Sequence, residues 1–328
     1  MIKLKQILYV IILFGYLKAE NLASDVSFLD LPLTAKSASL GNAFLSDLGS
    51  PTNLFLNPSN ILYEDKVNSK VAYRTSISTI NGMLGDYNNS NIMFSSHFKA
   101  VPLTLGLGYI NSKQSDIDYY DDNANYLGEI KFDESAISFG LASRFAGMNV
   151  GVSVALPQNQ FYGSSTSSQN KLTMLSSGFS MNNITVASLR EGWKVIIPNK
   201  LSLHACSRSL ISEESDIFSE NSLYKNIAGV RLDWDYPSVD SYLVMDILSN
   251  NKVTENYCNL GLGTRFPVLG QNTLGLNMGS NFSDISNLLD KTAFGLDIYF
   301  MDSFEFSVTF VNSDLNDYWI TSFKIYMK

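Results

Sequence analysis

The sequence predicts an all-β protein: a transmembrane antiparallel β-barrel of about fourteen strands that follows a short helical N-terminal plug segment. From residue 70 onward, bulky apolar residues alternate with small or polar ones in segments of about ten residues, as in membrane-barrel strands. Only 16% of the residues are charged, yet the mean hydropathy is just +0.02. A barrel with an apolar outer face and a polar interior explains both values, because alternation distributes its apolar residues.

Residues 1–19 are expected to be a cleaved signal peptide. Two lysines precede an apolar run from Ile7 to Leu17, and Ala19 is a suitable cleavage position. The run is too short to span a bilayer core of about 30 Å, so export is favoured over a membrane anchor. The mature chain then divides into an N-terminal helical segment, 20–66, and a barrel domain, 67–328.

Within the helical segment, a first helix is expected over Ala35–Leu40. Thr34 is a good N-cap residue, and Gly41 can end the helix in a left-handed conformation. A second helix should begin at Ser50–Pro51, because proline at the first helical position loses no needed N–H group. It must stop before Pro58, since a proline disfavours the helical conformation of the residue before it.

The stretch 28–62 mixes apolar residues with glycines, so it can pack on two sides. We expect it to fold inside the periplasmic mouth of the barrel and to plug it, its backbone bonded to polar side chains of the inner wall. The amide of Asn57 would donate to a wall carbonyl and fix the position of the plug. The candidate plug residues are Leu40, Gly41, Asn42, Asn57 and Pro58.

The faces of the last strands show the alternation most clearly. Over 291–300 the outward residues are expected to be Phe294, Leu296, Ile298 and Phe300, and the inward ones Ala293, Gly295, Asp297 and Tyr299. Small inward residues suit a crowded or ligand-lined lumen. A soluble β-sandwich also alternates, but it rarely needs so many long strands, and the export signal favours the barrel.

The strand count from the pattern is odd, about fifteen, whereas single-chain bacterial barrels have even strand numbers. Residues 171–180 and 183–190 are expected to be separate strands joined at Asn182–Asn183. A further strand over Trp193–Ile197 would give sixteen. Short connections such as 98–102 are expected on the periplasmic side, and long polar ones such as 111–133 and 158–170 outside the cell.

The N-terminal segment resembles a known family. The run Ala35–Ala43, then Asp47 and the stretch Leu54–Ile61, resembles the N-terminal signature of FadL-type outer-membrane barrels, and most of all the PorV/PorQ family, PorQ in particular. That pattern has a small-residue helix followed by Leu-Gly, and later an Asn-Pro motif. This sequence departs from it at Lys36, Asn42 and Ser59.

The resemblance implies fourteen strands and a location in the outer membrane, in contact with its lipid. PorV/PorQ membership implies an accessory role in type IX protein secretion or cell-surface attachment, with secretion-system proteins or secreted cargo as partners. FadL-like membership implies instead the transport of hydrophobic small molecules such as fatty acids. The two readings differ in the lumen, because a transporter needs an apolar ligand pocket there.

Neither composition nor motifs indicate an enzyme, a cofactor or a nucleic-acid partner. The net charge of −8 comes without any basic block to neutralise phosphates. The only histidines are His97 and His204; Ser202 and Ser207 lie near the second, but no G-x-S-x-G motif is present. A lumen histidine held by polar neighbours is the commoner case, so no catalytic residues are expected.

A metal site is not expected either. Four aspartates gather in one long connection, and spaced carboxylates can bind calcium, but the glycine of an EF-hand loop is missing. We expect a solvated acidic loop formed by Asp116, Asp118, Asp121 and Asp122. Cys206 and Cys258 fall on strands well separated along the chain, so we expect them not to form a disulfide.

Overall fold

The structure is a computed structural model. It describes residues 32–43, 47–62, 71–83, 87–98, 100–120, 126–162, 167–186, 198–212, 223–235, 239–250, 257–268, 272–282, 292–301, 303–312 and 317–327. The expected signal peptide and the boundary at residues 66 and 67 lie outside these ranges. No helix in the described part of the chain is long and apolar enough to cross a membrane.

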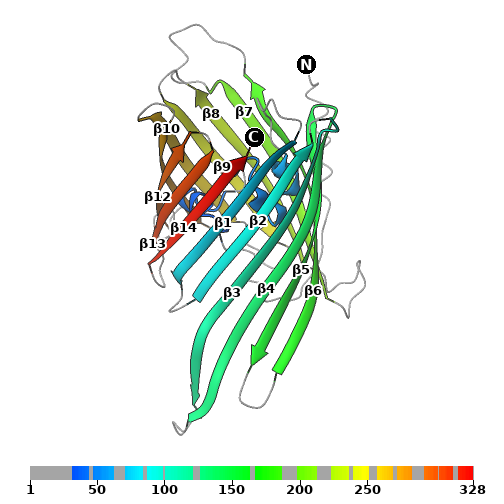
Figure 1. Ribbon diagram of the computed structural model, residues 1–328, viewed down its shortest axis with the longest axis vertical. Coiled ribbons are helices and arrows are strands. Elements are labelled where there is room, and N and C mark those ends of the chain that lie inside the picture. The colour runs from blue at the N-terminus through cyan, green and yellow to red at the C-terminus, as the bar shows by residue number, and fades with distance from the viewer. Residues whose placement is uncertain are drawn as a thin grey trace.

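Fourteen antiparallel strands form a closed barrel, in which each strand pairs with its neighbours in the chain and β1 closes the ring with β14 (Figure 1). The predicted fold class is confirmed. The strands are β1 (Val71–Met83), β2 (Tyr87–Phe98), β3 (Leu103–Tyr120), β4 (Tyr126–Phe145), β5 (Met148–Tyr162), β6 (Ser167–Thr185), β7 (Lys200–Ser212), β8 (Leu223–Asp235), β9 (Asp240–Asn250), β10 (Tyr257–Pro267), β11 (Thr273–Phe282), β12 (Thr292–Phe300), β13 (Phe304–Asn312) and β14 (Tyr318–Met327).

The strand count differs from the sequence pattern at β6. The expected turn at Asn182–Asn183 is a bulge inside this strand, which runs on to Thr185. The register against β7 shifts between Met181 and Ile184, and Asn183 has a left-handed φ of 55°. A bulge inserts a residue without ending the strand, so two expected segments become one and the even number is restored. The possible sixteenth strand over Trp193–Ile197 lies outside the described ranges.

The outer face of the barrel is apolar, as the alternation predicts. Phe294, Leu296 and Phe300 of β12 are exposed, whereas Ala293 and Asp297 are buried towards the lumen. Such a face avoids water only in contact with lipid. The closed barrel also leaves no strand edge unpaired, as a lipid environment requires. Other exposed outward residues include Tyr73, Ile92, Phe94, Leu107, Tyr109, Ile137, Phe139, Val152, Val154, Leu262, Met278, Phe306, Trp319 and Phe323.

The barrel is taller on one side. Strands β3 to β6 contain 15 to 20 residues, whereas β11 to β14 contain 9 or 10. In Figure 1 the four long strands extend beyond the others at the lower end of the view. The long strands extend beyond their outer neighbours, β2 and β7. On β3 the pairing with β2 ends at Lys113, and on β6 the pairing with β7 begins only at Leu172. A four-stranded sheet therefore projects from the end where β3 joins β4 and β5 joins β6. The long connections expected over 111–133 and 158–170 are wrong in these bounds, because most of their residues belong to these strands.

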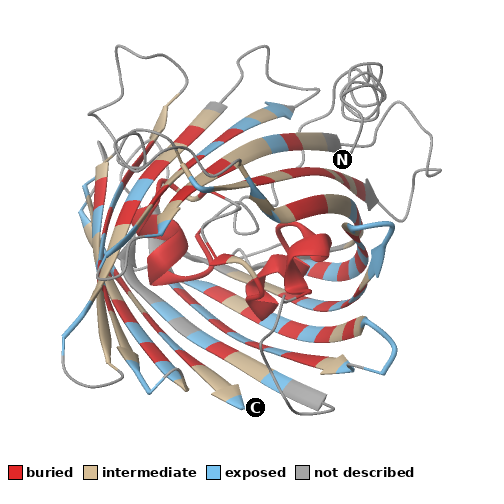
Figure 2. Cartoon of the chain, turned by 90° about the horizontal axis from the view of Figure 1, so that it is seen from above, coloured by how far each residue is buried: buried red, intermediate tan, exposed pale blue. Residues whose placement is uncertain are grey.

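The N-terminal segment lies inside the barrel. We call residues 32–43 and 47–62 the lumen segment; it contains α2 (Ala35–Ser39) and the 3-10 turns η3 (Pro51–Leu54) and η4 (Pro58–Ile61). Figure 2 looks down the barrel and shows these elements, buried throughout, in the middle of the ring of strands. Their wall contacts include Gly106 of β3 and Gly151 of β5, each close to the short-turn end of its strand. At β3 and β5 the segment thus lies near the short turns, whereas at β10 and β11 its contacts, Gly261 and Gly279, lie towards the opposite ends of the strands.

The local signals in this segment act as expected at three places. Thr34 caps α2 in a capping box with Ser37, and Gly41 follows the helix with a left-handed φ of 66°. Ser50 caps η3, where the predicted second helix is a single 3-10 turn. Asn57 is extended, as the following proline requires, and begins a third turn, η4, that was not expected.

Candidate functional site

The candidate site is the lumen itself, where inward-facing glycines make room for the lumen segment. A Cβ atom added at Gly151 would lie 2.4 Å from the backbone of Pro58 and Ser59, and one at Gly295 would lie 2.4 Å from the Ser39 Cβ atom. Real Cβ atoms do not approach other atoms so closely, so only glycine lets the two backbones approach at these points. Of the two kinds of lumen expected, crowded or ligand-lined, the structure shows a crowded one at these glycines.

Leu40 and Gly41 contact the wall at β10 and β11. A Cβ atom at Gly279 would lie 2.2 Å from the Gly41 nitrogen, and one at Gly261 would lie 2.7 Å from the Leu40 Cβ atom. Gly41 itself approaches the Ser280 carbonyl oxygen, where a side chain would reach within 2.2 Å. Its positive φ and this contact both require glycine.

One side of the lumen is apolar. Leu54 and Phe55 of the lumen segment pack with inward residues of β2 to β8 in a single buried cluster. Leu54 fits against the two glycines Gly106 and Gly140, with added Cβ atoms 2.7 Å from its side chain at both. The wall residues of this cluster are Met93, Ile110, Ala136, Ala142, Ala155, Met174, Leu210 and Ile227, and Leu172 and Leu248 pack against it.

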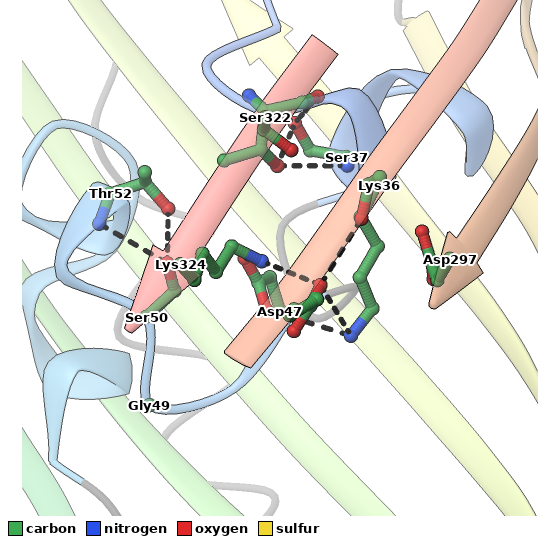
Figure 3. A network of polar contacts seen from close by, with 12 residues as sticks. Lys36, Ser37, Asp47, Gly49, Ser50, Thr52, Asp297, Ser322 and Lys324 are labelled. Atoms are coloured by element: carbon green, nitrogen blue, oxygen red, sulfur yellow. Dashed lines mark hydrogen bonds and ion pairs between the residues drawn. The ribbon is translucent and has the colours of Figure 1, made fainter. Parts of the chain in front are cut away.

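The other side of the lumen holds buried charges that tie the segment to β13 and β14 (Figure 3). Lys36 of α2 lies 3.6 Å from the Asp47 carboxylate and 3.8 Å from the Glu305 carboxylate. Lys324 lies 2.5 Å from Asp47 and 3.0 Å from Glu305, and the Tyr326 hydroxyl donates to Glu305 at 2.5 Å. Two ammonium groups thus share two carboxylates, which compensates burial of all four charges.

Lys36 reaches this cluster from the lumen segment. Burial lowers the pKa of its ammonium to about 8, the charge of Arg265 also lowers it, and the carboxylates of Glu305 and Asp47 oppose these effects. In the sequence, Lys36 stands out only as a departure from a family pattern. A lysine in a segment expected to be buried was itself the signal, since a buried charge needs a partner.

Wall side chains hydrogen-bond the backbone of the lumen segment, as expected for a chain inside a barrel. The Ser153 hydroxyl donates to the Leu54 carbonyl at 2.7 Å, and the Thr309 hydroxyl donates to the Ala35 carbonyl at 2.6 Å. The Asn259 amide donates to the Asn42 carbonyl at 3.1 Å. Further bonds to backbone groups come from Asn91, Arg208, Cys206, Ser322 and Arg74.

The role expected for Asn57 is wrong. Its side-chain oxygen accepts from the Ser59 backbone N–H at 3.2 Å and from the Ser59 hydroxyl at 2.8 Å, which caps η4. Its amide nitrogen is buried without a hydrogen-bond partner among the described residues. Asn57 therefore shapes the segment locally and meets the wall by packing, against Gly178, where a Cβ atom would lie 2.1 Å from its oxygen.

The five predicted plug residues all lie inside the barrel but in different places. Leu40, Gly41 and Asn42 contact β10 and β11, whereas Asn57 and Pro58 contact β5 and β6. The structure separates them into two contact regions on different parts of the wall. Phe28 and Leu31, at the start of the predicted plug stretch, lie outside the described ranges.

The histidines are held by polar neighbours. The His97 Nδ1 atom lies 2.9 Å from the Thr104 hydroxyl. The His204 Nε2 atom lies 3.3 Å from the Asp246 carboxylate, and the side chains of His204 and Asp246 are fully buried. The Ser202 hydroxyl accepts a hydrogen bond from the Asn183 backbone N–H, and the described contacts do not pair it with His204 as a nucleophile would be. Arg208, also on β7, donates to the Phe55 carbonyl.

The acidic connection and the cysteines offer no assembled site. Asp116 and Asp118 lie in β3, whereas Asp121 and Asp122 fall outside the described ranges. Within the described ranges, no three His, Cys, Asp or Glu residues are grouped so that they could hold a metal ion. Cys206 and Cys258 are both free thiols.

Comparison with known proteins supports the fold. No protein-family model matches the chain, and no curated protein matches its sequence significantly. Among solved structures, the CymD monoaromatic hydrocarbon channel has a TM-score of 0.54 at 9% identity, over 90% of this chain and 97% of that one. The P. putida toluene transporter TodX has a TM-score of 0.50 at 9% identity, over 90% and 98%. This chain shares their barrel fold.

A TodX variant described as a monoaromatic hydrocarbon channel gives the same result, with a TM-score of 0.53 at 10% identity over 90% of this chain and 98% of that one. All three alignments cover 90% of this chain and 97% or 98% of the other. At such low identity the similarity concerns the fold, and the chemistry of the lumen has to be argued from this chain's own residues.

Proposed function

We propose that the protein is an outer-membrane channel for small hydrophobic molecules, and that the lumen segment holds it closed. The observation that carries this proposal is the apolar side of the lumen. A general porin needs a polar, water-filled interior, whereas inward Met93, Ile110, Met174, Leu210 and Ile227 form an apolar cluster with Leu54 and Phe55 in this lumen. Sites for hydrophobic ligands are lined mainly by such side chains.

The apolar wall extends beyond the lumen segment. Leu172 on β6 and Leu248 on β9 are only partly buried, and both lie towards the end where β3 joins β4 and β5 joins β6. A hydrophobic molecule entering from that end would meet these residues first and then the cluster around Leu54 and Phe55. Movement of the lumen segment would leave apolar wall for the molecule to follow, because the wall glycines offer no competing side chains.

The outward belt of aromatic and aliphatic residues supports an outer-membrane location, and the short turns then face the periplasm. The similarity in fold to channels described for monoaromatic hydrocarbons and toluene supports the same class of substrate. The FadL-like reading of the N-terminal motif agrees with this proposal. The lumen segment, which carries that motif, would be the part that opens.

Uptake of labelled toluene and of labelled dodecanoate by cells that express the protein tests the proposal. Expression should raise the uptake rate of at least one compound above that of cells with an empty vector. Met174→Gln places a polar group in the apolar lumen and should lower uptake several-fold. Leu175→Gln, the next residue on the outer face, is the matched control and should leave uptake unchanged. No uptake above the empty vector would refute the channel.

A second candidate is an accessory role in type IX protein secretion, as the PorV/PorQ resemblance implies. The projecting sheet of β3 to β6 favours it, because a secretion accessory needs a partner surface outside the cell and no open lumen. Replacing residues 115–131 with Asn-Gly keeps the Gln114–Phe132 pair and shortens one hairpin. An accessory would lose secretion of its cargo in this variant, whereas a channel would keep its uptake.

A further inference from the structure

Cations and tyrosine rings alternate across the inner wall near the short-turn end. Arg231 of β8 lies 4.1 Å from the ring centre of Tyr242, and Arg265 of β10 lies 5.4 Å from the same ring. Arg265 also lies 4.9 Å from the ring of Tyr299, and Lys36 of the lumen segment lies 5.6 Å from that ring. The order is therefore Arg231, Tyr242, Arg265, Tyr299 and Lys36, and we call these five residues the cation–ring ladder.

The two end cations of the ladder have carboxylate partners. Arg231 donates to Asp233, with its Nη2 atom 2.8 Å from the carboxylate, and Lys36 pairs with Asp47 and Glu305. The middle cation differs. Among the described residues, Arg265 forms no ion pair or hydrogen bond, and its Nε atom is buried without an acceptor.

The rings on either side of Arg265 are fixed in place. The Tyr242 hydroxyl donates to the Asn277 side-chain oxygen at 2.8 Å, and the Asn277 amide donates to the Asp297 carboxylate at 2.7 Å. The Tyr299 hydroxyl donates to the same carboxylate oxygen at 3.2 Å. Asp297 thus bonds Tyr299 directly and Tyr242 through Asn277. Arg265 contacts the faces of these two rings.

The wall is shaped for this arrangement. A Cβ atom at Gly263 would lie 2.3 Å from the Tyr242 ring, so glycine is what lets this ring lie between the two arginines. Arg265 is only half-buried, two residues before the end of β10, so solvent at the short-turn end reaches it. A guanidinium held between two rings keeps its planar set of donors in one orientation.

We propose that Arg265 is the centre of an oxyanion-binding site, which takes a carboxylate or phosphate group that enters from the short-turn end of the lumen. A guanidinium binds both groups through two parallel N–H donors. The rings supply the rigid sides of the site. No carboxylate pairs directly with Arg265 among the described residues, although the charges of Glu305 and Asp297 act on it from nearby. The inference stands independently of the channel, since it depends on the ladder and not on the apolar wall.

Isothermal titration calorimetry on the full chain in a non-ionic detergent at pH 7 tests the site. The probes are inorganic phosphate, benzoate and dodecanoate, at constant chloride. Arg265→Gln should weaken binding about tenfold or more, because a charge-assisted bidentate contact is lost. Arg144→Gln is the matched control: Arg144 is an exposed arginine near the short-turn end of β4, bonded to Asn149, and its loss should leave affinity unchanged.

The probes distinguish the source of the anion. Binding of phosphate and benzoate that depends on Arg265 indicates small free anions, and Arg265-dependent binding of dodecanoate alone indicates the head of an amphiphile. Where Arg265→Gln does not fold, Arg265→Lys serves instead, and should weaken binding several-fold because lysine lacks the planar pair of donors. The site is refuted if the wild type binds none of the probes, or if the folded Arg265 variant binds them as the wild type does.

Discussion

Leu54 of the lumen segment lies against Gly106 of β3 so closely that a Cβ atom added at Gly106 would be 2.7 Å from the Leu54 Cδ2 atom. The wall residue and the segment residue therefore have to be considered as a pair. Their fit explains why a small residue occurs at an inward position near the start of β3. It also makes the docking of the segment testable without deleting it.

Gly106→Val should destabilise the docked segment by about 1–3 kcal/mol, because an added side chain overpacks the site. The barrel wall should still form, since valine is a good strand residue. Protease cleavage of the lumen segment in detergent, compared with heat-modifiable migration of the barrel, measures the two effects separately. Leu54→Ala combined with Gly106→Val should recover much of the loss, and additive losses would show that the two residues do not share a site.

Lys324→Met should destabilise the folded protein by about 3–5 kcal/mol, because it leaves Asp47 and Glu305 with one cation between them in a buried place. Lys113→Met is the control. Lys113 pairs with Asp133 at 3.5 Å with 61% of its side chain exposed, and such a pair contributes at most about 1 kcal/mol. Thermal unfolding followed by heat-modifiable migration compares the two. Equal effects would contradict the buried ion cluster.

Phe139→Lys should impair membrane assembly far more than Phe145→Lys, although both residues are outward on β4. Phe139 lies six residues before the end of the strand, whereas Phe145 is its last residue and 71% exposed. A lysine facing lipid costs about 2–4 kcal/mol near the midplane and about 0–1 kcal/mol at the interface. Folding yield into vesicles measures the difference. Equal yields would mean that the outer face does not contact lipid as proposed.

Asn57→Ala should destabilise the lumen segment by about 1 kcal/mol, the usual effect of losing an N-cap. Asn57→Ser keeps a capping oxygen but has no amide, so it should resemble the wild type. Protease access to the segment compares the three proteins. If the serine variant is cleaved as readily as the alanine variant, the Asn57 amide rather than its capping oxygen stabilises the segment, which would contradict the capping role.

The sequence predicts local structure in the lumen segment well, because caps and turns depend on neighbouring residues. Thr34, Gly41 and the Ser50–Pro51 pair each act where the pattern places them. Alternation likewise predicts the inward and outward faces, as on β12. The pattern does not predict the bulge at Asn182–Asn183, because asparagine tolerates the left-handed conformation that either a turn or a bulge can use, and only the pairing with β7 distinguishes the two.

The candidate site is less accessible to sequence reasoning. Lys36 meets Glu305 and Lys324 from positions nearly three hundred residues away, and only the closure of β1 with β14 brings them together. The same holds for Arg265 and its two rings, which come from three different strands. A usable signal was present in the inward glycines, such as Gly106 and Gly279, since glycine inside a strand marks close approach of another backbone.

The central claim is that the lumen segment closes the barrel. Single-channel conductance in planar bilayers tests it most directly, with the full-length protein compared with a variant lacking residues 28–62. Only material that shows the heat-modifiable migration of a folded barrel is used. The account predicts steady, open conductance for the deletion variant and a closed state for the full-length protein. A folded deletion variant that conducts no more than the full-length protein would contradict it.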